Sequence, residues 1–135
     1  MTRSPRRTLH SILLGLVLML FASPALAEDD LDSHYVTLEP VVVNMEASDR
    51  GRYLQASIQL EGNDLEDARA IREHLPAVRD RLIHVLGGRN PDNLAGGGAR
   101  EDLRNEATDE LNELLEEMTG SPRIEALYFS DFIRQ

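Results

Sequence analysis

Residues 52–61 read Arg-Tyr-Leu-Gln-Ala-Ser-Ile-Gln-Leu-Glu, and this stretch decides the fold. Apolar and polar side chains alternate along it, and the apolar set is Leu54, Ala56, Ile58 and Leu60. Because a β-strand sends successive side chains to opposite faces, this period of two predicts a strand with one apolar and one polar face. Burying each large apolar side chain contributes about 1.5–3 kcal/mol before entropy is counted, so the rest of the chain must cover that face.

A second strand is predicted before this one, over Tyr35–Met45, which is rich in valine. Pro40 interrupts it, and a proline cannot donate a hydrogen bond to a sheet. The strand must therefore lie at an edge or bend at that point. The connection Asn44–Gly51 contains the serine, aspartate and glycine typical of turns. The simplest arrangement of these segments is an antiparallel pair.

After Gly62 the apolar residues recur at spacings of three and four, which is typical of amphipathic helices. Asn63 or Asp64 is the expected N-cap, and Gly87 is expected to end the helix. Pro76 lies inside the stripe and should kink or split the helix, because proline lacks a backbone N–H. The stripe consists of Leu65, Ala68, Ile71, Leu75, Val78, Leu82 and Val85.

A glycine-rich loop is predicted over residues 89–98, followed by a second helix that ends at Gly120 and Pro122. The apolar stripe of this helix is Leu103, Ala107, Leu111, Leu114 and Met118. Its opposite side carries the acids Glu106, Asp109, Glu110, Glu113 and Glu117. A solvated helix face explains such a run without any partner, and the alternative is a ridge that binds a basic protein surface.

The chain ends on a third predicted strand, Ile124–Ile133, in which Tyr128 and Phe132 would share one face. Aromatic side chains that the core does not need are candidate anchors for a partner or for another copy of the chain, unless all of them pack under the helices. The other face would carry Leu127, Phe129, Asp131 and Ile133. The predicted fold class is α+β, in the order β-β-α-α-β, with a small three-stranded sheet covered by two amphipathic helices.

The first 27 residues predict a secretory signal peptide. Arginines precede the apolar run Ile12–Ala22, and the small residues Ala25 and Ala27 predict cleavage before Glu28. Residues 28–34 would then form an acidic flexible leader, and residues 35–135 would form one folded domain. The alternative is an uncleaved membrane anchor, although the run is shorter than the about 20 apolar residues that span a bilayer.

Composition narrows the classes of partner. The 135 residues carry a formal net charge of −10, and removal of a signal peptide would remove three arginines and no acid. Such a surface repels nucleic acid and anionic lipid, and it suits docking to a basic protein face. There is no cysteine, so an exported domain would depend on packing or self-association for its stability.

Residue patterns typical of catalysis, metal binding or cofactor binding are not found. His74 and His84 are ten residues apart, which is about 280° around a helix, so they cannot share a metal on one face. Asp80 and His84, one turn apart, are expected to form a simple intrahelical pair. The glycines at 96–98 follow no strand and the chain has no lysine, so they do not predict a phosphate loop. We expect no enzymatic activity, no metal and no cofactor.

Several short segments, taken in their order along the chain, carry a family resemblance. They are Tyr35–Pro40, Val42–Asn44, Arg52–Gln55, Gln59–Glu61, Leu75–Pro76, Val78–Asp80, Leu111–Asn112, Leu127–Phe132 and the terminal Gln135. Together these segments resemble the flagellar basal body-associated protein family FliL, and the resemblance spans residues 35–135.

The resemblance implies a stomatin-like domain in the periplasm, near the inner membrane at the flagellar basal body. Such a domain is expected to assemble into a ring around the stator units of the motor, as a scaffold that supports swimming or swarming. It implies no reaction, cofactor or catalytic residue. Family members usually begin with a membrane-spanning helix, whereas this chain begins with a predicted signal peptide, so a divergent family member is expected. The alternatives are a freed domain that joins the ring by its own contacts and a divergent paralogue with a weaker motor role or a different partner. The alternative function is a soluble periplasmic protein-binding module unrelated to motility.

Overall fold

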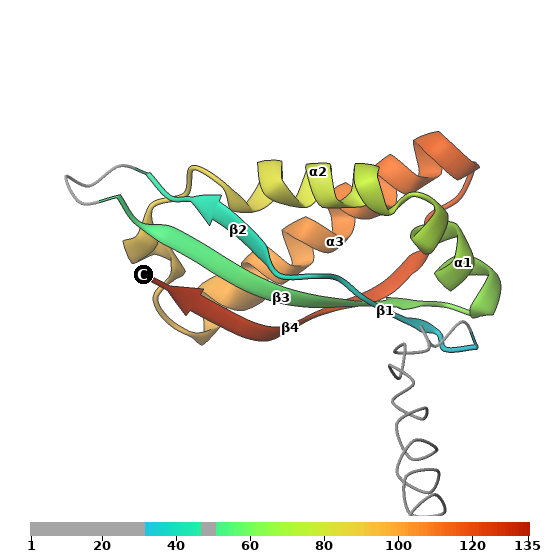
Figure 1. The fold of residues 1–135 in the computed structure, drawn as a ribbon, viewed down its shortest axis with the longest axis horizontal. Helices are drawn as coiled ribbons and strands as arrows, with labels where there is room; N and C mark the ends of the chain where they lie inside the picture. Colours follow the sequence, from blue (N-terminus) through green and yellow to red (C-terminus); the bar gives the residue numbers. More distant parts are fainter. Residues whose placement is uncertain (1–31, 47–50) are drawn as a thin grey trace, which may run out of the picture.

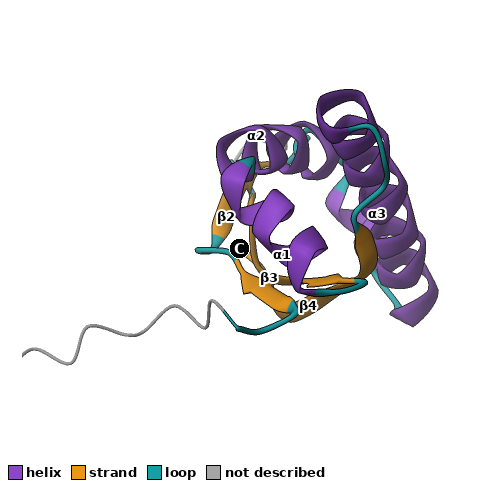
Figure 2. Ribbon diagram, turned by 90° about the vertical axis from the view of Figure 1, so that its right-hand side faces the viewer, coloured by secondary structure: helices purple, strands orange, loops and turns teal. Residues whose placement is uncertain are grey.

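The computed structural model describes residues 32–46 and 51–135. An antiparallel sheet carries the helices on one face, and the described residues leave the other face open (Figure 1, Figure 2). The predicted α+β class is confirmed. The predicted signal peptide, its cleavage site at Ala25, Ala27 and Glu28, and most of the acidic leader lie outside the described residues.

The central strand is β3, Tyr53–Gly62, which confirms the strand predicted over residues 52–61. Its four apolar side chains at alternate positions are completely buried, and the side chains between them are exposed or half-buried. Leu60 pairs with Val36 of an N-terminal strand and with Leu127 of the C-terminal strand. Since a strand has two edges, the N-terminal and C-terminal strands lie on opposite edges of β3.

The strand predicted over Tyr35–Met45 is divided into β1, Tyr35–Thr37, and β2, Val41–Asn44. Both run antiparallel to β3 along the same edge, as Pro40 predicted. Two consecutive exposed residues, at positions 39 and 40, shift the alternation by one residue and return the valines to the core. The buried side chains on either side of this interruption are Val36, Leu38, Val41, Val43 and Met45.

The first predicted helix is split into α1, Leu65–Glu73, and α2, Leu75–Leu86. His74 forms the junction, and Pro76 occupies the first turn of α2, where its missing N–H leaves no hydrogen bond unmade. Asp64 is the N-cap of α1, accepting a hydrogen bond from the backbone N–H of Asp67 over 2.8 Å. The split at Pro76 and the cap were both predicted correctly.

The loop predicted over residues 89–98 is partly wrong. It contains the 3-10 helix η1, Pro91–Leu94, and its last glycines belong to α3, Gly97–Thr119. Asn90 caps η1 by accepting a hydrogen bond from the N–H of Asp92, and both Pro91 and Leu94 are buried. A capping asparagine followed by proline therefore starts a helical turn here, and burial of two apolar side chains stabilises it.

The long helix α3 buries a stripe that differs in its second half from the predicted one. Leu103, Ala107 and Leu111 are buried as expected, but the next buried residue is Leu115, and Met118 is 46% exposed. The stripe keeps a spacing of four because α3 packs across α2 and β4 at the same time. Gly120, with φ of 88°, ends the helix in the left-handed conformation.

The last strand, β4, Ile124–Arg134, pairs antiparallel with β3, as predicted. The predicted assignment of its side chains to the two faces of the sheet is wrong beyond Phe129. Ile58 pairs with Phe129, but the adjacent Ser57 pairs with Asp131, so one residue of β4 has no partner in β3. The extra residue, Ser130, forms a β-bulge and shifts the alternation by one. Phe132 consequently faces the helices beside Phe129, with ring centroids 5.3 Å apart, and does not share a face with Tyr128.

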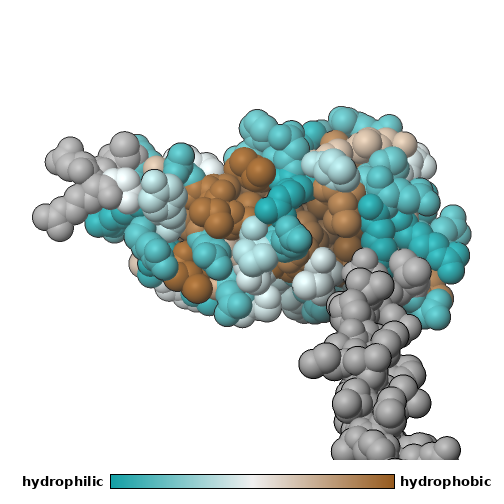
Figure 3. Space-filling view, in the orientation of Figure 1, coloured by the Kyte–Doolittle hydropathy of each residue, from teal (hydrophilic) through white to brown (hydrophobic). Residues whose placement is uncertain are grey.

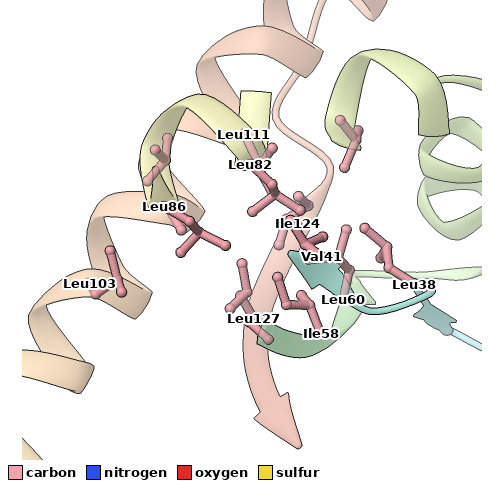
Figure 4. Close-up of a cluster of buried hydrophobic side chains, with 14 of the residues drawn as sticks. Leu38, Val41, Ile58, Leu60, Leu82, Leu86, Leu103, Leu111, Ile124 and Leu127 are labelled. Carbon is pink, nitrogen blue, oxygen red and sulfur yellow. The ribbon is translucent and has the colours of Figure 1, made fainter. Parts of the chain in front are cut away.

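The core lies between the covered face of the sheet and the helices (Figure 4). Helix α2 packs on β2, α3 packs on β4 and α2, and α1 packs on the end of the sheet formed by β1 and β3. The side chains labelled in Figure 4 are Leu38, Val41, Ile58, Leu60, Leu82, Leu86, Leu103, Leu111, Ile124 and Leu127. Every layer of the fold therefore contributes to one continuous core.

Candidate functional site

Among the described residues, the pairing of a histidine with an acid is confined to the exposed surface of α2. His84 Nδ1 lies 3.7 Å from the carboxylate of Asp80, and both side chains are about three-quarters exposed, which confirms the predicted intrahelical pair. Over residues 32–46 and 51–135, no three His, Asp or Glu side chains gather closely enough to hold a metal ion.

The acidic side of α3 is not one continuous free ridge. Glu106 forms an ion pair with Arg89 at 2.6 Å, and Glu110 forms one with Arg81 at 2.8 Å. These two acids stabilise the contact of α3 with α2 and the segment after it. Glu113 and Glu117 are exposed, and no ion pair involves them in the part of the chain that the structure describes. A role for any of these four acids in binding a partner stays a prediction.

The open face of the sheet carries most of the exposed large apolar side chains. We define the open sheet face by five of them, which the strand register places on the side away from the helices. They are Tyr35, Val42, Tyr53, Tyr128 and Ile133, each 41–57% exposed. Only Tyr128 was singled out from the sequence as a candidate. The others could have been found as the residues that alternate with the core residues of the same strands.

Three groups meet at one end of the open sheet face. The Tyr128 hydroxyl donates a 2.6 Å hydrogen bond to the carboxylate of Glu61. Hydrogen bonding to Glu61 raises the pKa of both Tyr35 and Tyr128, and the charge of Glu125 raises them further. Asp131 lies on the same face, opposite Ser57. No Arg or His is among the residues that the register places on this face in residues 35–135, so its charge is negative.

Phe132, the other predicted aromatic anchor, lies on the covered side. The guanidinium carbon of Arg100, from the first turn of α3, lies 4.8 Å from the centre of its ring, a cation–π distance. With Phe129 it closes the core where β4 meets the start of α3. Phe132 is only partly buried, so its role as an interface residue stays a prediction.

A polar cluster fixes the start of β4. Arg123 forms a 2.8 Å ion pair with Asp67 of α1, and the two side chains are 17% and 11% exposed. Burial alone would raise the pKa of Asp67, but hydrogen bonds from Arg123 and Asn63 outweigh it and lower the pKa below its ordinary value. Asn112 of α3 accepts from the N–H groups of Arg123 and Ile124 and donates to the Ile124 carbonyl. These contacts are structural, and sequence reasoning missed them.

Shallow grooves flank both edges of the sheet. One of about 550 Å³ runs between β4 and α3, where Glu125–Tyr128 face Arg104–Asp109, and a smaller one of about 250 Å³ continues it toward Phe129. Another, also of about 550 Å³, lies between the β1–β2 segment and the start of α2, lined by Thr37–Glu39, Leu75, Pro76 and Arg79. Apolar surface gathers on this side, between α2 and the N-terminal strands (Figure 3).

A comparison with models of known families matches residues 35–135 to FliL, the flagellar basal body-associated protein family. The match covers the strands and helices described above from β1 to the final Gln135.

The chain belongs to the FliL family. This confirms the resemblance predicted from the sequence, and a flagellar basal body-associated role follows from it. FliL is a structural component of the flagellum that is not known as an enzyme. A comparison with curated individual proteins finds no match. None of the helices within the described FliL-like fold has the length and apolar character needed to cross a membrane.

Proposed function

We propose that this FliL family member is a non-enzymatic scaffold in the periplasm, near the inner membrane, which supports the flagellar stator during swimming or swarming. The observation that carries the proposal is the family match over the whole described fold. The open sheet face supports it, since exposed aromatic side chains on a rigid sheet are suited to contact with other proteins.

Deletion of the gene, followed by complementation, tests this role. We expect the deletion to reduce swimming or swarming and to impair the response of the motor to load, and we expect the wild-type gene to restore both. Complementation with Tyr53→Ser should restore less than complementation with Glu117→Gln, because Tyr53 belongs to the open sheet face. Unchanged swimming, swarming and load response in the deletion strain would contradict the proposal.

The periplasmic location rests on the N-terminal sequence. Cleavage before Glu28 would release the domain, whereas retention of residues 1–27 would anchor it. Sequencing the N-terminus of the exported protein distinguishes the two, and we expect it to begin at Glu28. A mature terminus upstream of Glu28 would contradict cleavage at this site.

We further propose that copies of the chain assemble into a ring around stator units, as the family resemblance implies. The chain has no cysteine, so the contacts would be non-covalent. Light scattering on the purified, processed protein should show species heavier than a monomer. A monomer alone at high concentration would argue against ring formation by this protein without partners.

The second candidate, a periplasmic binding module unrelated to motility, is favoured by the exposed Glu113 and Glu117 on α3. Charge reversal of both residues tests whether they bind a basic partner. If every partner that co-purifies with the wild-type protein also co-purifies with the reversed variant, these acids are not a binding surface and the second candidate loses its support.

A further inference from the structure

The two edges of the sheet differ in how their backbone groups are satisfied. Along the edge formed by β1 and β2, arginine side chains of the helices bind the outward carbonyls. Arg72 donates to the carbonyls of Ser33 and Tyr35 over 2.9 and 3.0 Å. Arg79 donates to those of Glu39 and Pro40 over 2.9 and 3.0 Å. These guanidinium groups occupy the positions that another strand would need.

The same edge is closed at its far end by the segment after α2. The N–H of Gly88 donates to the Asn44 carbonyl over 2.8 Å, and the N–H of Glu46 donates to the Arg89 carbonyl over 2.9 Å. A sheet edge whose backbone groups are occupied resists pairing with other chains. The β1–β2 edge is therefore capped at its start, at its middle and at its far end.

The edge of β4 is uncapped. Tyr53 and Gln135 exchange both backbone hydrogen bonds, and alternate residues of an antiparallel pair bond across it. The backbone N–H and C=O groups of Phe132 and Arg134 thus point away from β3, and beyond the bulge those of Leu127 do the same. Within residues 32–46 and 51–135, none of these outward groups has a hydrogen-bond partner.

Space for another segment is present beside this edge. The grooves of about 550 and 250 Å³ follow β4 from Glu125 to Phe129, with α3 as their far wall. The two grooves share Arg104 and Tyr128, so they form one channel. A long uncapped edge is normally a liability for aggregation. Its presence opposite a capped edge indicates that it is used.

We propose that the free edge of β4 binds an extended segment of a partner protein, which joins the sheet as an added strand and carries Arg or Lys at alternate positions. Addition of a strand to a sheet edge obtains affinity from backbone hydrogen bonds and specificity from alternate side chains. The inference does not depend on the flagellar role, since it concerns binding by the purified protein.

The charges beside β4 specify the basic residues of the partner segment. Alternate side chains of an added strand would lie on the open sheet face, next to Tyr128 and Asp131. Glu125 lines the groove beside the same edge. Opposite charges in neighbouring strands attract, and a guanidinium or ammonium group also binds to the face of a tyrosine ring. No Arg is among the residues that the register places on this face. Arg104, on the far wall of the groove, forms an ion pair with Glu101 at 3.3 Å.

A second copy of the chain fits this edge poorly. If two β4 strands paired antiparallel about Tyr128, Glu125 of one copy would lie opposite Asp131 of the other, and like charges in such pairs are destabilising. Pairing of β4 with the β1–β2 edge of another copy is blocked by Arg72 and Arg79. Copies that assemble into a ring would therefore use other surfaces.

A synthetic peptide tests the proposal. The probe is the heptapeptide Arg-Thr-Arg-Val-Arg-Thr-Arg with both termini blocked. The protein is expressed from the whole 135-residue sequence and purified after any processing by the cell. Amide hydrogen exchange is followed by NMR. At a peptide concentration ten times the dissociation constant, exchange at Leu127 and Phe132 should slow about tenfold. Exchange at Val42, on the opposite edge of the sheet, should not change.

Matched controls separate strand addition from simple charge attraction. The same peptide with every backbone amide N-methylated keeps its charge but has no backbone N–H to donate from either edge, so it should not protect β4. Glu125→Arg with Asp131→Arg should weaken binding of the basic peptide about tenfold or more. Glu73→Arg with Glu116→Arg, the same change of charge at two exposed helix positions, should leave it unchanged.

Three results would overturn the proposal. The first is no slowing of exchange at the β4 amides at millimolar peptide. The second is equal protection by the N-methylated peptide, which would show non-specific charge attraction. The third is protection of the β4 amides without peptide, rising with protein concentration together with a dimer in light scattering, which would make a second copy the occupant.

Discussion

The covered and open faces of β3 are made by alternate residues of one strand, yet they follow different physical constraints. Leu54, Ile58 and Leu60 are fully buried, whereas Tyr53 keeps 49% of its surface exposed. The covered face must match the shape of the helices packed on it, because close-packed cores tolerate few changes of volume. On the open face the side chains contribute little to folding, so their identities are free to serve binding.

Ile58→Ala breaks the covered face and should have the largest effect on stability. Ile58 is completely buried at the centre of the sheet, between Leu38 of the β1–β2 connection and Phe129 of β4. The lost side chain and the cavity it leaves should lower the free energy of unfolding by about 3–4 kcal/mol. Chemical denaturation followed by circular dichroism measures this loss.

The control for that variant is Gln59→Ala, on the open face of the same strand. It should change the free energy of unfolding by no more than about 0.5 kcal/mol. Equal losses for the two variants would mean that the open face is covered in solution, by a segment or partner outside the described residues.

Arg123→Ala should have the next largest effect, because it removes the ion pair that joins α1 to the start of β4. Asp67 would stay buried without its main partner, at a cost of about 2–3 kcal/mol in the free energy of unfolding. Arg104→Ala removes an exposed pair with Glu101 and should cost about 0.5 kcal/mol or less. A loss of under 1 kcal/mol for Arg123→Ala would show that the partly buried pair behaves like a surface pair.

The covered face was predictable from the sequence because its signal is local. The alternation in residues 52–61 and the effect of Pro76 follow from backbone geometry alone, and the structure confirms both. The shift of the alternation at Glu39–Pro40 and the bulge at Ser130 were not predicted, because each depends on how a strand pairs with its neighbour. A period of two cannot reveal where one extra residue enters.

The candidate site was less predictable for the same reason. Glu106 and Glu110 have the same sequence signal as Glu113, but only the packing of α3 on α2 decides which acids meet arginines. The capped and free edges are defined by side chains about 40 residues away along the chain, as with Arg79 and Glu39. Such contacts carry no local periodicity that a sequence pattern could show.

Acid should weaken the fold through Asp67. Its pKa is lowered in the folded state, so folding favours the carboxylate, and the resulting stability is present at neutral pH and is lost as pH falls through the folded-state pKa. Urea denaturation between pH 7 and pH 3 should therefore show wild type losing more stability than Asp67→Asn, which has no carboxylate to protonate. A constant difference between the two proteins over this range would contradict the assignment.

Glu61→Gln tests the open face and should have the smallest effect on stability, under about 0.5 kcal/mol, because Glu61 is only half-buried and its partners are exposed. The substitution should still change the pH range over which Tyr35 and Tyr128 ionise. Glu61 raises the pKa of Tyr35 and Tyr128 by accepting hydrogen bonds and by its negative charge, so the neutral amide should let both titrate at lower pH, followed by ultraviolet absorbance. An unchanged titration of Tyr35 and Tyr128 would show that the hydrogen bond from Tyr128 to Glu61 does not persist in solution. The open face would then present separate side chains, without the ordered acidic end that a basic partner segment requires.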